Sequence, residues 1–301
     1  MSPIDHTIDD VIGRLAAISP QEQALGLRGS NVMPQVEAIA EVMRLIGSVI
    51  FPGLLDRPTL SEQSRPYRIG VDVENILTSL ARQIAFTVAF ECDHDEVRSR
   101  RIGIDKARRF IATLPEIRRL LLTDVEAMVG GDPAVKSAGE VVYSYPVVQV
   151  MLHYRVAHEL HRLGVPIIPR IITEQAHSAT GIDIHPAAQI GEYFAIDHGT
   201  GVVIGATTII GKHVSIYQGV TLGAKSFKRD DAGRLLDVPR HPIIEDYVTI
   251  YSNASILGRI TIGHHSVIGG NVWLDRSVLP HSRILQGKPI EQQHFEWADG
   301  I

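Results

Sequence analysis

An aliphatic residue recurs at every sixth position through much of the second half of the chain. Two interruptions reset the count, one within 197–201 and one between Leu222 and Ile244. A period of six fits neither an α-helix, which repeats about every 3.6 residues, nor a flat strand, which repeats about every two. It is typical of a hexapeptide β-helix, in which three short sides make one triangular coil. The repeating positions are Ile184, Ile190, Ile196, Ile204, Ile210, Ile216, Ile244, Ile250, Ile256, Ile262, Ile268 and Leu274.

A second set of residues is expected to face the same core. Small or β-branched residues stand four places after most of the aliphatic positions, and Gly or a polar residue often follows the aliphatic directly. Stacked coils would bury both sets together, and the number of repeats predicts about four coils. The spacing does not specify the hand of the coil. The second inward positions are Ala188, Thr208, Val214, Val220, Val248, Ala254, Ile260, Ser266, Val272 and Val278.

The first half of the chain shows helical spacing instead. Apolar residues three and four places apart predict helices over 34–50, 72–92, 95–129 and 146–163, the third of them broken near Pro115. For residues 1–30 we predict a short helix or a loose arm. We therefore predict an α+β fold with three parts.

The three parts are a helical N-terminal domain, a hexapeptide-repeat β-helix and a short tail. The helical domain is predicted over 1–165, because Gly164-Val165-Pro166 ends the last helix. The solenoid is predicted over 166–290, beginning after Pro169, and the tail over 291–301.

Composition narrows the class of protein. Hydrophobic residues make up 45% of the 301 residues and charged residues 21%, as in an ordinary globular protein. The net charge of -5 argues against a general nucleic-acid binder. No apolar run approaches the roughly 18 residues of a membrane span, and the first ten residues lack the basic start of a signal peptide. A single cysteine cannot form an internal disulfide, so we expect a cytoplasmic protein.

Departures from a regular repeat are the places to look for chemistry. They are the stretch 197–201, the loop 223–241 and the start of the solenoid at 183–186. Asp183 and His198 lie slightly less than one coil apart in the sequence, so we expect them to be neighbours on adjacent coils. A histidine whose far nitrogen contacts a carboxylate is a general base held in one tautomer.

Several short motifs stand out between residue 131 and the end of the chain. They are Asp132-Pro133-Ala134, Asp183-Ile184-His185-Pro186-Ala187, Asp197-His198-Gly199-Thr200-Gly201, Val220-Thr221-Leu222-Gly223, Arg240-His241-Pro242 and, at the very end, Asp299-Gly300-Ile301. With these motifs, the region from Gly131 to Pro289 resembles the serine acetyltransferases. The resemblance implies a left-handed β-helix and an enzyme that transfers acetyl from acetyl-CoA to the L-serine hydroxyl. The products would be O-acetyl-L-serine and CoA, in cysteine biosynthesis.

The resemblance assigns the serine site residue by residue. His198 would be the general base and Asp183 would orient it. Asp132 and Asp197 would receive the serine ammonium group. Arg240 would bind the serine carboxylate in the two-pronged way that guanidinium groups favour, with His241 beside it.

The resemblance also assigns the acetyl-CoA groove. It would lie near Gly223, Ala224, Ser252 and Gly270, and backbone N–H groups near the first two would stabilise the oxyanion. We expect direct transfer in a ternary complex, without a metal. The loop 224–239 is longer and more charged than the glycine-rich loop of many relatives.

Partners follow from the same resemblance. The family implies trimers, or dimers of trimers, with shared active sites, and often inhibition by L-cysteine in the serine site. The C-terminal Ile301 would bind O-acetylserine sulfhydrylase, because backbone N–H groups can capture a terminal carboxylate.

Two other classes of function stay open. One is a different hexapeptide-repeat enzyme. It would either use an acceptor such as homoserine or a sugar, which does not need both Asp132 and Arg240, or hold a metal on three converging histidines. The other is a non-enzymatic scaffold that only binds the sulfhydrylase through Ile301.

Overall fold

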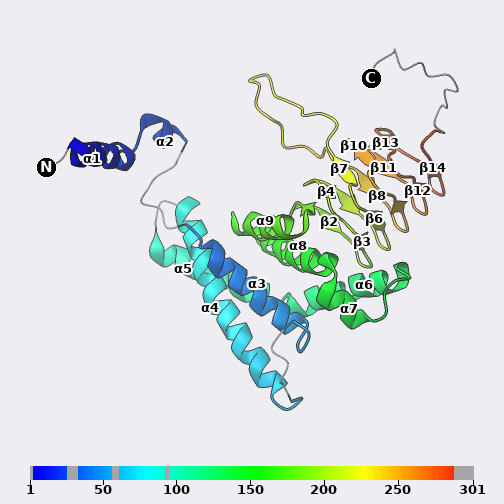
Figure 1. Ribbon diagram of the computed structural model, residues 1–301, viewed down its shortest axis with the longest axis horizontal. Helices are drawn as coiled ribbons and strands as arrows, with labels where there is room; N and C mark the ends of the chain where they lie inside the picture. The colour runs from blue at the N-terminus through cyan, green and yellow to red at the C-terminus, as the bar shows by residue number, and fades with distance from the viewer. Residues whose placement is uncertain (1–2, 26–32, 56–60, 92–94, 288–301) are drawn as a thin grey trace.

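A computed structural model describes residues 3–25, 33–55, 61–91 and 95–287 of the chain. Helices fill the N-terminal part, and a parallel β-solenoid follows (Figure 1). This is the predicted α+β architecture. The helices are α1 (Pro3–Ala16), α2 (Pro20–Ala24), α3 (Val36–Ile50), α4 (Arg65–Glu91), α5 (Glu96–Ile111), α6 (Leu114–Gly131), α7 (Ala138–Ser144), α8 (Pro146–Arg162) and α9 (Ile168–Thr180).

Local sequence explains where several helices begin. Asp95 caps α5 by accepting a hydrogen bond from the Arg98 backbone N–H at 2.9 Å. Proline stands in the first turn of α6 and of α8, where its missing N–H costs nothing. The predicted helix over 95–129 is therefore two helices, α5 and α6. None of the described helices combines the length and hydropathy that a bilayer crossing needs.

Helix α9 is a departure from the predicted order. The solenoid does not follow directly after Pro169, because residues 168–180 form this additional helix and the first strand begins at Asp183. Pro169 occupies its first turn, and Gly181 ends it with a φ of 72°, a left-handed conformation that glycine adopts without strain. Ile168, Ile172 and Ala176 are buried. Helix α9 thus joins the helical core to the first coil.

Three parallel sheets form the sides of the solenoid. Their strand orders are β1-β4-β7-β10-β13, β2-β5-β8-β11 and β3-β6-β9-β12-β14, so each strand pairs with one from the next coil. The strands are β1 (Asp183–Ile184), β2 (Gln189–Ile190), β3 (Ala195–Asp197), β4 (Val203–Ile204), β5 (Ile209–Ile210), β6 (Ser215–Tyr217), β7 (Thr221–Gly223), β8 (Ile243–Ile244), β9 (Thr249–Ile250), β10 (Ser255–Leu257), β11 (Thr261–Ile262), β12 (Val267–Ile268), β13 (Trp273–Leu274) and β14 (Arg283–Ile284).

The predicted inward positions form the core of the solenoid. Eleven of the twelve repeating aliphatic residues are buried and Ile190 is partly buried, and every residue of the second set is buried. Ile184 pairs with Ile204, and Ile204 with Leu222, so like positions stack from coil to coil. Each fully buried aliphatic side chain contributes about 1.5–3 kcal/mol of hydrophobic stabilisation.

A buried ion pair fastens the helical part to the first coil. Arg155 on α8 donates to both carboxylate oxygens of Asp124 on α6, each at 2.7 Å. Arg155 also donates to the Gly191 carbonyl at 2.9 Å, and the Asp124 carboxylate accepts from the Phe194 backbone N–H at 3.2 Å. The orientation of the two parts is thereby fixed by paired polar groups as well as by apolar packing.

Candidate active site

The predicted site residues gather at two different corners of the triangular coil. We call the corner that follows the β3–β6–β9–β12 side the His198 edge, and the corner that follows the β1–β4–β7–β10 side the Arg240 edge. The His198 edge comprises residues 198–202, 218–220, 251–254 and 269–272, and the Arg240 edge comprises residues 185–188, 205–208, 224–242 and 258–260.

At the His198 edge, the two extra residues of the first coil turn a histidine outward. His198 has a φ of 58° and the following Gly199 a φ of 84°. A Cβ on Gly199 would lie 2.5 Å from the Ile182 side chain, so both the conformation and the packing require glycine. The His198 side chain is 73% exposed, and its Nδ1 lies 3.9 Å from an oxygen of Asp197. The imidazole is thus open to solvent outside the coil.

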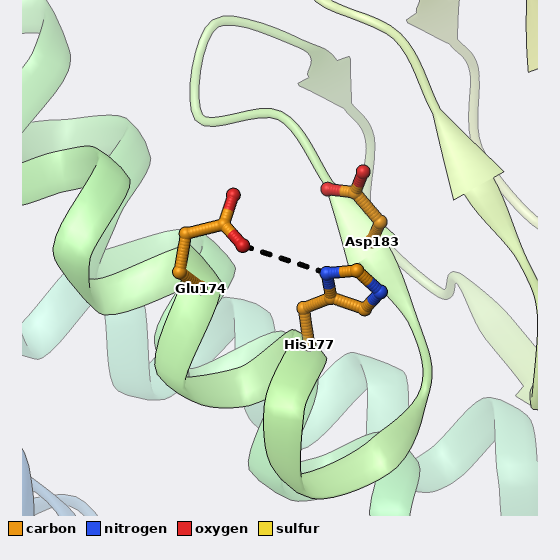
Figure 2. A group of neighbouring side chains, drawn as sticks. All are labelled: Glu174, His177 and Asp183. Atoms are coloured by element: carbon orange, nitrogen blue, oxygen red, sulfur yellow. Dashed lines mark ion pairs between the residues drawn. The ribbon is translucent and has the colours of Figure 1, made fainter.

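Asp183 lies at the same end of the first coil as His198. It pairs in register with Val203, which begins β4 just after the His198 edge. Among the described residues, however, His198 has its carboxylate contact with Asp197, and Asp183 faces Glu174 and His177 instead (Figure 2). The predicted pairing of Asp183 with His198 therefore stays a prediction.

A second aspartate approaches the His198 edge from the helical part. Asp132 ends α6, and its two carboxylate oxygens accept from the Ala134 backbone N–H at 2.8 Å and from the Tyr145 hydroxyl at 2.9 Å. The hydrogen bond to Asp132, partial burial and the charges of Asp132, Glu140 and Asp197, in that order, raise the pKa of Tyr145. Asp132 and Asp197 thus act on one tyrosine from two elements. Together they make a negative surface suited to a cation.

The Arg240 edge is positive and tightly packed. His241 is 7% exposed, and its Nδ1 accepts from the Thr207 backbone N–H at 3.1 Å, which leaves its proton on Nε2. The Thr207 hydroxyl also accepts from the Arg240 backbone N–H at 2.9 Å. Burial and the charges of Arg240 and Arg259 lower the pKa of His241. A neutral imidazole therefore stands beside a permanent guanidinium charge.

Arg240 has one unsatisfied donor, and its Nη1 lies 3.9 Å from a carboxylate oxygen of Asp237. Its Nε is buried and has no hydrogen-bond partner among the described residues, and its guanidinium lies 5.9 Å from the centre of the Phe227 ring. The neighbouring His185, at the same edge, also experiences this positive charge. Burial and the charges of Arg170, His161, His241 and Arg240, in that order, lower the pKa of His185 to about 4. An unpaired buried donor within a positive cluster is suited to a carboxylate.

Comparison with known proteins identifies the family. The chain is 45% identical over 277 residues to a plasmid serine acetyltransferase of Synechococcus elongatus, covering 89% of this chain and 86% of that protein. The chain belongs to the serine acetyltransferase family, and the protein is a transferase. A family description for bacterial transferase hexapeptide repeats also matches residues 241–276.

Solved serine acetyltransferases share the fold. Isoform 3 from Entamoeba histolytica, in complex with cysteine, superposes with a TM-score of 0.72 at 31% identity, covering 89% of this chain and 87% of that one. Serine acetyltransferase 1 from the same organism, in complex with L-cysteine, gives 0.70 at 32% identity and covers 84% and 87%. These matches confirm the predicted left-handed hexapeptide-repeat β-helix.

The residues predicted to contact acetyl-CoA divide between the two edges. Ser252 and Gly270 are stacked at the His198 edge, where a Cβ on Gly270 would lie 3.2 Å from the Ser252 carbonyl oxygen. Gly223 and Ala224 lie where the long loop leaves β7 at the Arg240 edge, the yellow segment of Figure 1. This loop folds back on itself through a bridge between Arg229 and Leu235.

The sequence analysis of this serine acetyltransferase did not find the residues that hold the predicted site side chains in place. Thr207 supports both Arg240 and His241 through hydrogen bonds between residues more than thirty positions apart, which spacing does not reveal. Tyr145 was also missed, because nothing in the sequence shows that its hydroxyl reaches Asp132. Gly205 offered a signal, since it is one of several glycines that directly follow a repeating aliphatic.

Gly205→Ala is expected to disturb the Arg240 edge. A Cβ there would lie 2.0 Å from the His241 ring, and the buried ring has little room to withdraw. We expect a loss of about 1–3 kcal/mol in unfolding free energy from overpacking, with a raised KM for serine. Urea unfolding and steady-state kinetics measure both.

Gly70→Ala is the control, because open space surrounds that helical glycine. Its unfolding free energy should rise by about 0.5–1 kcal/mol. Equal behaviour of the two variants would contradict the packing argument.

Proposed function

We propose that this protein transfers acetyl from acetyl-CoA to the hydroxyl of L-serine, giving O-acetyl-L-serine and CoA in cysteine biosynthesis. The observation that carries the proposal is the pair of oppositely charged edges. One edge presents an exposed histidine beside Asp197, with Asp132 held by Tyr145 in the helical part, and the other presents Arg240 with an unpaired buried donor. Serine is a zwitterion with a hydroxyl to be deprotonated, so it needs a group of each kind.

The two edges lie on different corners of one coil, which suggests how a site is completed. No hydrogen bond or ion pair within the described part of the chain joins Arg240 or His241 to Asp132, Asp197 or His198. We infer that the His198 edge of one copy meets the Arg240 edge of the next. A closed trimer with three such sites satisfies this geometry, because a heterologous contact repeated around a ring uses each edge once. A dimer of trimers would preserve the same sites.

The reaction proceeds in a ternary complex. Arg240 and His241 bind the serine carboxylate, and Asp132 and Asp197 bind the ammonium group. His198, oriented by Asp183, takes the hydroxyl proton as the serine oxygen attacks the thioester carbonyl. Backbone N–H groups near Gly223 and Ala224 stabilise the resulting oxyanion. Collapse breaks the carbon–sulfur bond, and the departing CoA sulfur receives the proton from His198.

The remaining binding roles follow the same edges. Ser252 and Gly270 of one copy and Gly223 and Ala224 of the next would line the groove for acetyl-CoA. L-cysteine, which is bound in the Entamoeba structures, has the same zwitterion as serine and would compete for its site. Ile301 lies outside the described residues, so binding of O-acetylserine sulfhydrylase through the C-terminus stays a prediction, as does the cytoplasmic location.

Release of free thiol from acetyl-CoA by the purified protein tests the proposal. We expect release to depend on L-serine and to be inhibited by L-cysteine competitively with serine. Homoserine and sugars are the comparison acceptors. Homoserine carries the same two charges as serine but places its hydroxyl one methylene farther from them, and a neutral sugar carries neither charge. Release that is faster with one of these acceptors would assign a different transferase. No release with any acceptor, combined with binding of the sulfhydrylase, would support a scaffold.

A further inference from the structure

A histidine and two carboxylates converge where α9 meets the first strand. Glu174 and His177 lie three residues apart on the last turns of α9, and Asp183 begins β1 after the turn at Gly181. One potential ligand atom of each residue lies within 4.8 Å of the other two. Figure 2 shows the three side chains directed toward a common space beside the helix. The Glu174 Oε2 to His177 Nδ1 distance is 3.5 Å.

We propose that Glu174, His177 and Asp183 bind a divalent cation of the Zn²⁺ or Mn²⁺ class. One imidazole with two carboxylates is a donor set that such ions accept. A Glu-x-x-His pair on a helix places both ligands on one face, as in helical carboxylate metal centres. Bond lengths of about 2.0–2.2 Å require donor atoms roughly 3–4 Å apart, so a small rotation of the side chains completes the site.

Two further observations point to a ligand. The carboxylate of Asp183 is partly buried, yet it has no hydrogen-bond or ion-pair partner in the described part of the chain. The side chains of Glu174 and His177 are 49% and 45% exposed, so an ion can enter from solvent. Glu174 also contacts Arg170 through its other oxygen. Two carboxylates therefore face the ion, and one of them shares its charge with Arg170.

Cation binding has a consequence for catalysis, and this part rests on the proposed function. Asp183 is the residue assigned to orient His198. A cation on the Asp183 carboxylate neutralises its charge and holds it toward Glu174 and His177, so binding of the ion weakens its support of the general base. The cation is therefore an inhibitor of acetyl transfer that acts without occupying the serine site.

Calorimetric titration of untagged, EDTA-treated protein with Zn²⁺ tests the site itself. We expect Glu174→Gln and His177→Gln each to weaken binding by about tenfold or more, since loss of even an outer partner of a metal ligand costs about 10–100-fold. Both side chains are half-exposed, so thermal unfolding of the variants should match that of the parent protein.

Two control variants isolate the site. Glu159→Gln removes the same charge from the neighbouring helix α8, where Glu159 pairs with Arg162 at 2.9 Å. His281→Gln removes an imidazole from the stacked pair His265 and His281, whose ring centres are 5.0 Å apart. Both should retain the Zn²⁺ affinity of the parent at the proposed site. Equal affinity in the parent, Glu174→Gln and His177→Gln proteins, or no binding to the parent, would overturn the proposal.

The activity measurement separates this proposal from the proposed function. Zn²⁺ should inhibit serine-dependent thiol release by the parent protein, and about tenfold more Zn²⁺ should be needed for Glu174→Gln and His177→Gln. The inhibition should not be relieved by added serine. Binding that is lost in these variants, in a protein without acetyl transfer, would uphold the site and reject the function. If acetyl transfer is observed but Zn²⁺ inhibits the parent and all variants equally, the proposed function would be upheld and the cation site rejected.

Discussion

Replacing His198 with alanine is expected to lower the serine-dependent rate about 100- to 10 000-fold, the usual contribution of a general base. The side chain is 73% exposed and belongs to no part of the core, so the variant should fold normally. Thiol release at saturating acetyl-CoA and serine measures the effect, and thermal unfolding checks the fold. A decrease of less than tenfold would assign the proton transfer to another group.

Mixing two inactive variants tests whether the site is shared between copies. The His198→Ala protein retains an intact Arg240 edge, and the Arg240→Ala protein retains an intact His198 edge. In a mixed trimer, a site formed by the intact edge of each variant would therefore be complete. Random mixing should restore about a quarter of the parent activity, because each contact joins different edges of two copies. A mixture of His198→Ala with Asp132→Ala is the control, since both changes affect the same edge. Failure of the first mixture in trimers shown to be mixed would place the whole site in one chain.

The solenoid was predictable because its core repeats. Each aliphatic position faces inward once per side of the coil, and a period of six therefore survives in the sequence even where loops interrupt it. Ile244 follows a long loop, yet it is buried and pairs in register with Ile210. Helix α9 was less predictable. Pro166 and Pro169 suggested an end to helical structure, whereas Pro169 occupies the first turn of a new helix.

The candidate site was only partly predictable, because the arrangement of its side chains depends on contacts between residues far apart in the sequence. The resemblance supplied His198, Asp132, Asp197, Arg240 and His241, but their division between two corners appears only when the strands are placed in register. The histidine that approaches Asp183 was not predicted either. His177 reaches it from a helix that the sequence analysis did not predict.

The ion pair between Arg155 and Asp124 should have the largest effect on stability. Their side chains are only 3% and 5% exposed, so loss of either one leaves a buried charge without its partner. Arg155→Leu or Asp124→Leu is expected to lower the unfolding free energy by about 3–5 kcal/mol. Urea unfolding followed by circular dichroism measures the loss. Arg162→Leu on the same helix is the control, because its partner Glu159 forms an exposed pair with it, worth about 0–1 kcal/mol.

The double variant Arg155→Leu/Asp124→Leu distinguishes the charge from the packing. Removing both charges should cost less than the two single losses added together, because no unpaired charge is left in the core. The double variant should still be less stable than the parent protein. The Gly191 carbonyl and the Phe194 N–H each lose the partner that these side chains supply. Additive losses would mean that the two residues act independently. In that case the separate hydrogen bonds to the Gly191 carbonyl and the Phe194 N–H, and not the ion pair, would account for the contribution of each residue.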